Sequence, residues 1–335
     1  MLKIKILASA LLFSVVFVCS TFLPQNASAS EESGDSFNPG EMIMHHVKDD
    51  HSWHFFGDVT LYLPVIIYSE EKGLDVFMSS KFFNENHETV PYKGYVLEHG
   101  HISLESGGHV SDFSITKNVA FLFLNSALLL WIFFAVANGY KKNKGKAPKG
   151  IQSFFEPIII FIRDEVVKPN IGENYRKYLP YMLSLFFFIW FGNLLGLFPG
   201  AANLTGNIAV TLVLAVGTFI LTNFSGNKHY WKHIFWTPGV PLPLRIIILP
   251  VEVIGIFTKP ISLMIRLFVA ITAGHIVILS LIALTFIFSS YAVGLGSSLI
   301  VIFINLIELL VATIQAYVFT MFSSLYIGMA VEDHH

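Results

Sequence analysis

Long apolar stretches with very few charges constrain this chain more than any other feature. From Ile246 to Val331 only four side chains are formally charged, and from Leu179 to Asn227 there are none. A membrane-spanning helix needs about 20 apolar residues. A soluble domain carries roughly 25% charged residues, whereas this chain has 13% charged and 54% hydrophobic residues. The sequence therefore predicts an all-α polytopic membrane protein.

The apolar stretches divide into about five membrane-embedded helices. The first expected span is Val119 to Ala137. A Pro- and Gly-containing turn divides the uncharged stretch into spans at about 179–198 and 207–225, and a group of Gly and Ser residues divides the last stretch into segments at about 245–288 and 298–331. The last two segments are longer than a perpendicular crossing needs, so we expect them to tilt strongly.

Charged residues between the spans predict the topology. Residues 151–168 mix an apolar stripe with charges, which suits an amphipathic helix at the membrane interface. Lys228, Lys232 and Arg245 flank a Trp- and Pro-rich loop. A lysine cluster follows the first span: Lys141, Lys142, Lys144, Lys146 and Lys149. The positive-inside rule places both basic loops in the cytoplasm, and alternation of the spans from an external N-terminus places the C-terminus there too.

The first 29 residues have the layout of a signal peptide. Lys3 and Lys5 precede a short apolar core from Ile6 to Val18, and Ala27-Ser28-Ala29 fits a cleavage signal. The alternative is an uncleaved first membrane helix, but the core is shorter than the roughly 20 residues of a span. A cleaved signal would place the next segment outside the cytoplasm. The predicted location is a bacterial inner membrane.

Residues 30–117 are polar and predict a small extracytoplasmic region, part β and part loop, before the membrane domain at 118–335. Strand-like pieces occur at 59–63 and 95–97. Cys19 is the only cysteine, which excludes a disulfide framework. Eight histidines lie here: His45, His46, His51, His54, His87, His99, His101 and His109. They lack metal-ligand spacing, so we favour a solvated polar segment over a metal site.

The few charges inside the last stretch are candidate functional groups. A charge at the centre of a membrane helix costs about 2.5–3.5 kcal/mol even on the mild insertion scale. Such groups mark an ion path or, alternatively, a buried salt bridge that only fixes helix packing. The charged residues are Glu252, Lys259, Arg266 and Glu308, and His275 is the one histidine.

Ideal helix geometry separates these groups into levels. Glu252 and Arg266 lie within about 40° of each other on one face, about four turns apart. His275 lies about 180° from Arg266 and roughly 13 Å further along. On the next helix, Glu308 and Gln315 lie within about 20°, two turns apart.

The chemistry of these residue types suits proton translocation. Arginine does not lose its proton at accessible pH, so Arg266 suits attracting a partner's carboxylate and blocking proton leakage. Histidine titrates near neutral pH, and burial can bring a carboxyl group towards the same range. His275 and Glu308 together suit passing protons through water.

Four sequence motifs surround or precede these ionisable residues. The most specific is Lys259-Pro260-Ile261-Ser262-Leu263-Met264-Ile265-Arg266-Leu267-Phe268, followed by Ala273-Gly274-His275. The others are Asn193-Leu194-Leu195-Gly196-Leu197, Asn203-Leu204-Thr205-Gly206-Asn207-Ile208-Ala209-Val210-Thr211, and Glu308 seven residues before Gln315-Ala316-Tyr317-Val318-Phe319. Together they resemble the subunit a family of ATP synthases, over about Val119 to Val331. Ala270 departs from the family, whose members often have Asn there.

The resemblance implies roles for five residues. Arg266 would be the stator arginine that faces the rotor carboxylates. His275 and Glu308 would form a histidine/acid pair in the extracytoplasmic half-channel, Glu252 would line the cytoplasmic half-channel, and Gln315 would be a polar neighbour of the arginine. The implied partners are a ring of c-type rotor subunits, b-type subunits of the peripheral stalk and the rest of the complex. Protons are the default ion, and sodium stays open.

Other functions are less consistent with the sequence. A net charge of −2 argues against a nucleic-acid-binding protein. No G-x-x-x-x-G-K-S/T loop occurs, so we expect no nucleotide site and no cofactor in this chain. A secondary cation/proton transporter should show internal repeats with matched broken helices, and the two long terminal segments have no counterpart. A membrane anchor or assembly factor leaves the intramembrane charges without a purpose.

Overall fold

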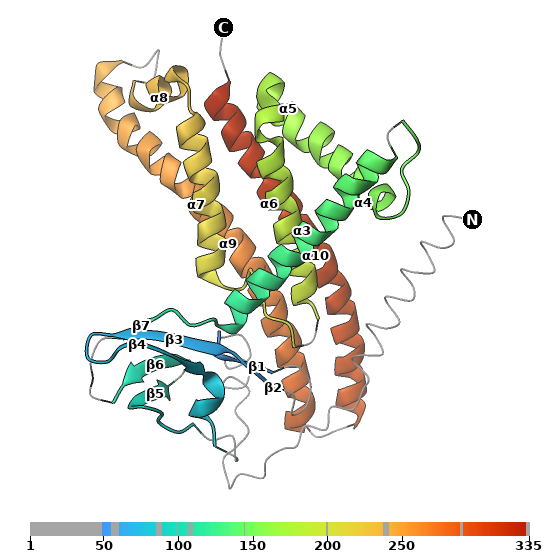
Figure 1. Ribbon diagram of the computed structural model, residues 1–335. Helices are drawn as coiled ribbons and strands as arrows, with labels where there is room; N and C mark the ends of the chain where they lie inside the picture. The colour runs from blue at the N-terminus through green and yellow to red at the C-terminus, as the bar shows by residue number, and fades with distance from the viewer. Residues whose placement is uncertain are drawn as a thin grey trace.

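The computed structural model consists of a bundle of long helices with a small β unit at one end (Figure 1). The last helix ends at the opposite end of the bundle. The expected signal peptide lies outside the residues that the structure describes. Those residues are 49–54, 60–84, 89–98, 100–105, 107, 110–143, 145–198, 200–236, 241–288 and 291–332.

Five helical stretches of the described chain are long and apolar enough to cross a membrane, which confirms the expected fold class. Their main helices are α3 (Lys117–Lys142), α6 (Tyr175–Gly196), α7 (Ile208–Ser225), α9 (Leu242–Phe288) and α10 (Tyr291–Val331). The two longest, α9 and α10, run obliquely across α6 and α7 (Figure 1). The protein is therefore a multi-pass membrane protein.

The expected amphipathic helix comprises three consecutive pieces. They are α4 (Ile151–Phe161), the π-helical turn η2 (Ile162–Val167) and α5 (Lys168–Ile171), and a short 3-10 turn, η3 (Gly172–Asn174), leads into α6. Part of its apolar stripe is buried against neighbouring helices, as at Phe155, and part is exposed, as at Phe154. At Gly328 of α10 the backbone of Asn170 leaves no room for a Cβ atom. This segment is thus packed closely into the bundle.

Two boundaries differ from the sequence-based expectation. The loop after α7 contains a helix, α8 (Lys228–Phe235), whose N-terminus is capped by the side chain of Asn227. Helix α10 begins at Tyr291, so four of the residues that were expected to separate the last two spans lie within it: Gly294, Gly296, Ser297 and Ser298. A backbone in hydrocarbon must satisfy its hydrogen bonds internally, so the helix continues through them. A Cβ atom at Gly294 would lie 3.2 Å from Thr285 Cγ2 of α9, so this glycine permits a close approach.

The β unit contains three small antiparallel sheets. Strand β1 (Ser52–His54) pairs with β2 (Thr60–Tyr62), and β5 (Tyr95–Glu98) pairs with β6 (His101–Leu104). The central sheet has the order β4-β3-β7, with β3 (Pro64–Ser69), β4 (Gly73–Met78) and β7 (Val110–Asp112), and a 3-10 turn, η1 (Ser79–Phe82), follows β4. The side chains of Val65, Ile67, Phe82 and Tyr95 form its core. The expected β content is confirmed.

Direct contacts fix the β unit to the helices. The indole of Trp53 donates a hydrogen bond to the carbonyl of Gly200, between α6 and α7, at 2.7 Å. The carboxylate of Asp49 accepts hydrogen bonds from the hydroxyl of Thr116 at 2.8 Å and the amide of Asn118 at 3.0 Å. Trp53 also packs edge-on against Phe121 of α3. These contacts anchor the unit at the first turn of α3.

One histidine of this region is buried rather than solvated. His51 Nε2 lies 3.0 Å from Asp112 Oδ2. Burial acts to raise the pKa of Asp112, but hydrogen bonds from His51 and Ser114 outweigh it and lower the pKa to about 2. His45, His46, His87, His99 and His109 lie outside the described residues. Among those described, no group of three or more His, Cys, Asp or Glu residues could hold a metal ion.

Candidate functional site

The ionisable residues of α9 contact α10 in antiparallel order. His275 contacts Glu308, whereas Arg266, earlier in α9, contacts Phe322, later in α10. Helical arithmetic placed His275 and Arg266 on opposite faces of α9. Both nevertheless reach α10, the arginine through its long side chain. The two contacts lie at separate levels, because Glu308 and Phe322 are about 21 Å apart along α10.

The level nearer the turn between α9 and α10 is a buried acid/histidine pair. His275 Nδ1 lies 3.4 Å from Glu308 Oε1, and Glu308 is only 3% exposed. A Cβ atom at Gly274 would lie 2.8 Å from Glu308 Oε1, so the absence of a side chain there makes room for the carboxylate. Neither carboxyl oxygen has a hydrogen-bond partner among the described residues. The pair joins two groups that can each bind and release a proton.

The second level holds the arginine. The guanidinium carbon of Arg266 lies 4.3 Å from the centroid of the Phe322 ring, a cation–π geometry. Gln315 lies seven residues from both Glu308 and Phe322, so the three side chains start from one face of α10. Arg266 is partly exposed. A permanent cation therefore lies further from the turn of the α9–α10 hairpin than the acid/histidine pair does.

Glu252 lies far from that pair, at the other end of α9. It lines a cavity of about 560 Å³ between α8, α9 and the end of α10. The polar and charged lining residues are His229, Tyr230, Lys232, His233, Glu252, Lys259 and Glu332. The structure thus brings His275 and Glu308 together and leaves Glu252 in a separate, charged cavity.

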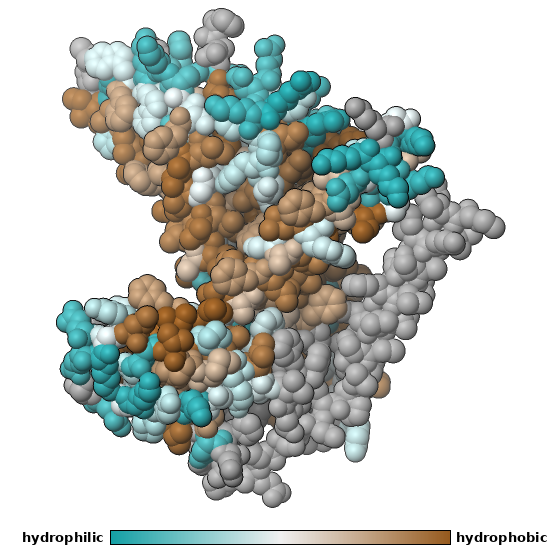
Figure 2. Space-filling model, viewed as in Figure 1, coloured by the Kyte–Doolittle hydropathy of each residue, from teal (hydrophilic) through white to brown (hydrophobic). Residues whose placement is uncertain are grey.

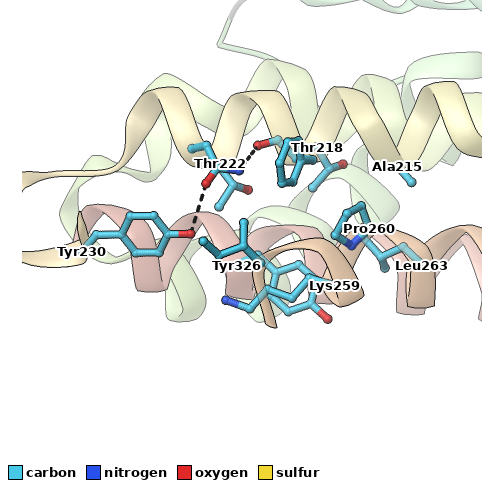
Figure 3. A pocket seen from close by; sticks show the side chains of 11 residues that line it. Ala215, Thr218, Thr222, Tyr230, Lys259, Pro260, Leu263 and Tyr326 are labelled. Carbon is cyan, nitrogen blue, oxygen red and sulfur yellow. Dashed lines mark hydrogen bonds between the residues drawn. The ribbon is translucent and has the colours of Figure 1, made fainter. Parts of the chain in front are cut away.

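A second, smaller cavity continues from the first towards the arginine. Both cavities are lined by Tyr230, Ile256 and Lys259. In Figure 3, Tyr230 lies at one end of the lining, Leu263 lies at the other, and Lys259 and Tyr326 lie between them. This cavity therefore ends at an apolar side chain, Leu263, which is about one helical turn before Arg266 in α9.

Sequence reasoning missed the hydroxyl groups of this region. Thr218 Oγ1 of α7 lies 3.1 Å from the Tyr181 hydroxyl and 3.2 Å from the Ser323 hydroxyl of α10. Thr211, Thr218 and Thr222 are buried on one face of α7. Their spacing of seven and four residues was the signal that could have revealed this face.

Two of the side chains that line both cavities, those of Lys259 and Tyr230, contact other polar or aromatic groups. The Lys259 ammonium lies 5.4 Å from the centroid of the Tyr326 ring. In α8, burial and, secondly, the charge of Glu252 raise the pKa of Tyr230, which therefore remains a hydrogen-bond donor. Its hydroxyl donates to Asn223 Oδ1 at 3.4 Å.

A buried amide fixes α10 beside these levels. The side chain of Asn193 in α6 donates a hydrogen bond to the carbonyl of Ala312 at 3.1 Å. Its oxygen accepts a hydrogen bond from Thr205 at 2.7 Å. Since Ala312 lies one turn after Glu308, this network holds α6, the α6–α7 turn and α10 together where the acid/histidine pair lies.

Comparison with known proteins gives two family matches. The model described as the ATP synthase A chain matches residues 119–328, which contain Glu252, Arg266, His275, Glu308 and Gln315. A model described as a Domain of unknown function (DUF8433) matches residues 42–120, which include the β unit.

Curated relatives agree with the first match. ATP synthase subunit a 2 of Chlorobaculum tepidum is 42% identical over 320 residues, covering 92% of this chain and 78% of the relative. ATP synthase subunit a of Chloroherpeton thalassium is 46% identical over 239 residues, covering 69% and 71%. That of Anaeromyxobacter sp. is 37% identical over 319 residues, covering 92% and 75%. The family model and these long alignments together show that this chain belongs to the ATP synthase A chain family.

Proposed function

We propose that this chain is the stationary proton-conducting subunit of an F-type ATP synthase. Two half-channels would carry protons to and from the carboxylates of a rotor ring. The observation that supports this most directly is the order of the polar groups along α9 and α10. A buried acid/histidine pair lies on one side of Arg266, and a charged cavity lies on the other.

Arg266 would separate the two half-channels. A guanidinium stays charged at any accessible pH, so it cannot relay a proton. It can attract a rotor carboxylate in its ionised form and favour release of that group's proton. Its contact with Phe322 does not occupy the N–H donors of the guanidinium, because a cation–π contact uses the face of the aromatic ring and needs no hydrogen bond.

The two half-channels would differ in their lining. His275 and Glu308 would exchange protons in the extracytoplasmic half-channel, and Gln315 would be a polar neighbour of the arginine. Glu252 would line the cytoplasmic half-channel, together with Lys259 and the hydroxyl groups that the cavities expose.

The partners would contact the exposed faces of the helices. We propose that a ring of c-type subunits packs against α9 and α10, where large apolar side chains such as Ile265 and Val269 are exposed. Subunits of the b type in the peripheral stalk would hold this chain stationary. Both partners would be embedded in the same bilayer.

The orientation follows from charge. The loop after α3, the start of α6 and helix α8 all carry basic residues, and Figure 2 shows hydrophilic surface at this end of the molecule. By the positive-inside rule, this end would be cytoplasmic, with the C-terminus. The β unit would lie outside the cytoplasm, after cleavage of the signal peptide, and the membrane would be a bacterial inner membrane.

Replacement of Arg266 tests the proposal. Arg266→Ala should abolish ATP-driven proton pumping in inverted membrane vesicles, and Arg266→Lys should fail too, because an ammonium, unlike a guanidinium, can lose its proton once the rotor ring buries it. Arg176→Lys is the matched control, since Arg176 is an exposed arginine at the start of α6. Complex assembly is measured on the same preparations. Near-normal pumping by the lysine variant would contradict the proposal, and would favour a different transporter mechanism.

A further inference from the structure

The outer face of strand β4 is apolar. Its alternating residues Leu74, Val76 and Met78 are 66%, 59% and 48% exposed. Tyr68 of the neighbouring strand and Phe113, after β7, are 49% and 68% exposed. Each of these side chains is large and hydrophobic, and about half or more of each is exposed within the part of the chain that the structure describes. Contiguous exposed apolar patches of this kind mark interaction sites.

These residues form one continuous surface, which we call the β4 patch. Tyr68 pairs with Leu74 and Ile66 pairs with Val76 across the β3–β4 ladder. The amide of Phe113 donates a hydrogen bond to the carbonyl of Ile66 at 2.9 Å. Side chains of directly paired residues lie on the same face of an antiparallel sheet, so the patch extends from β4 across β3 to Phe113, the residue that follows β7.

The other outer face of the unit is polar. The outward residues of β6 and the turn that follows are His101, Ser103 and Glu105, whereas Ile102 and Leu104 are buried. This is the pattern of a sheet that faces water on one side. The β4 patch breaks that pattern within the same small unit, so the two faces are suited to different surroundings.

The position of the β4 patch identifies its surroundings. Phe113 is four residues before Lys117, where the membrane helix α3 begins, so at most about 14 Å of chain separates them. The β3–β4–β7 sheet lies on the side of the unit nearer the helices, and β5 and β6 lie further away (Figure 1). In Figure 2 hydrophobic surface on the β unit faces the hydrophobic flank of the helices across a hollow.

We propose that the β4 patch lies against the lipid bilayer, at the boundary between headgroups and acyl chains on the β-unit side of the membrane. The contacts of Trp53 and Asp49 fix the unit to α3 and the α6–α7 turn, so the patch is held next to the bilayer without further ordering. Aromatic residues such as Phe113 and Tyr68 suit this boundary. The proposal depends on α3 spanning the membrane and not on the proton path.

Fluorescence quenching by lipids tests this proposal. In a Cys19→Ser background, Val76→Cys is labelled with an environment-sensitive fluorophore, and Phe113→Cys provides a second position in the β4 patch. The matched control is Ser103→Cys, an exposed strand position on the polar face. The assembled complex is reconstituted in vesicles of phosphatidylethanolamine and phosphatidylglycerol. Lipids brominated on the acyl chain should quench both patch positions several-fold more than the control, and aqueous iodide should show the opposite order.

Each other outcome would overturn the proposal. Strong iodide quenching at positions 76 and 113 would show that the patch faces water. Protection from both quenchers would show that a protein segment covers it, either another subunit or another part of this chain. Labelled complexes must retain ATP-driven pumping, which shows that the β unit is examined in the assembled protein.

Discussion

The two polar regions of the α9–α10 hairpin differ in how they hold charge. At His275 the carboxylate of Glu308 is almost completely buried and fits against the backbone of Gly274. At the other end, Glu252 shares a cavity of about 560 Å³ with several charged and polar side chains. One region contains a single close pair, and the other contains many groups around open space.

This difference predicts different sensitivities to mutation. In a close buried pair, each member determines the protonation of the other, and no third group replaces it. In an open cavity, water and neighbouring side chains can substitute for one lost group. We therefore expect large and non-additive effects at the pair and small effects at the cavity.

Of the changes in these two regions, single substitutions of His275 or Glu308 should have the largest effects. Glu308→Gln and His275→Ala each remove a group that exchanges protons, so pumping should fall by about tenfold or more. The double variant His275→Glu with Glu308→His should recover activity beyond either single exchange, because coupled residues are non-additive. Pumping and complex assembly are measured in the same membranes.

If the pair only held two helices together, the single variants would lose assembly and not proton flux. Normal pumping in the single variants would refute the relay. So would a double variant no better than the worse single exchange.

An intermediate effect is expected from a methyl group beside the pair. Gly274→Ala would place a Cβ atom 2.8 Å from Glu308 Oε1 and force the carboxylate to move. Pumping should fall severalfold, since small displacements of reacting groups have large effects. Gly255→Ala on the same helix is the control, because no atom lies within 4 Å of its Cβ position. Equal loss in both variants would indicate a general helix effect and contradict this account.

The smallest effect is expected in the cavity. Glu252→Gln removes one charge among several lining groups, and partly exposed charges contribute about 1 kcal/mol or less. Pumping should therefore fall by no more than about fivefold. A complete loss of pumping in an assembled complex would mean that the cavity depends on a single group, and the contrast between the two regions would fail.

Much of the fold could be predicted from the sequence, because a long run of consecutive apolar residues is a strong signal of a membrane-spanning helix. The five spans follow from it, and each overlaps one of the five long apolar helical stretches of the described chain. Helix α8 was missed because eight residues give too short a pattern. The start of α10 was placed too late because Gly and Ser separate soluble elements but continue a helix in a membrane.

Candidate site residues were predictable only as charges in apolar surroundings. That signal pointed to His275 and Glu308, which the structure brings together. It could not reveal the hydroxyl contact between Thr218 and Ser323, because neutral side chains are common in membrane helices and their pairing depends on tertiary packing. Nor could it show that Gly274 makes room for Glu308, since this depends on how α9 crosses α10.

The central claim is that the two polar regions open to opposite sides of the membrane, with Arg266 between them. Single cysteines in a Cys19→Ser background test it, at Gly255→Cys in the cavity and at Asn305→Cys, one turn from Glu308. Each is treated with a membrane-impermeant thiol reagent in inverted and in right-side-out vesicles, and labelling is measured by mass spectrometry. Position 255 should react faster in inverted vesicles, and position 305 in right-side-out vesicles. Preferential labelling of both positions from the same side would contradict the account.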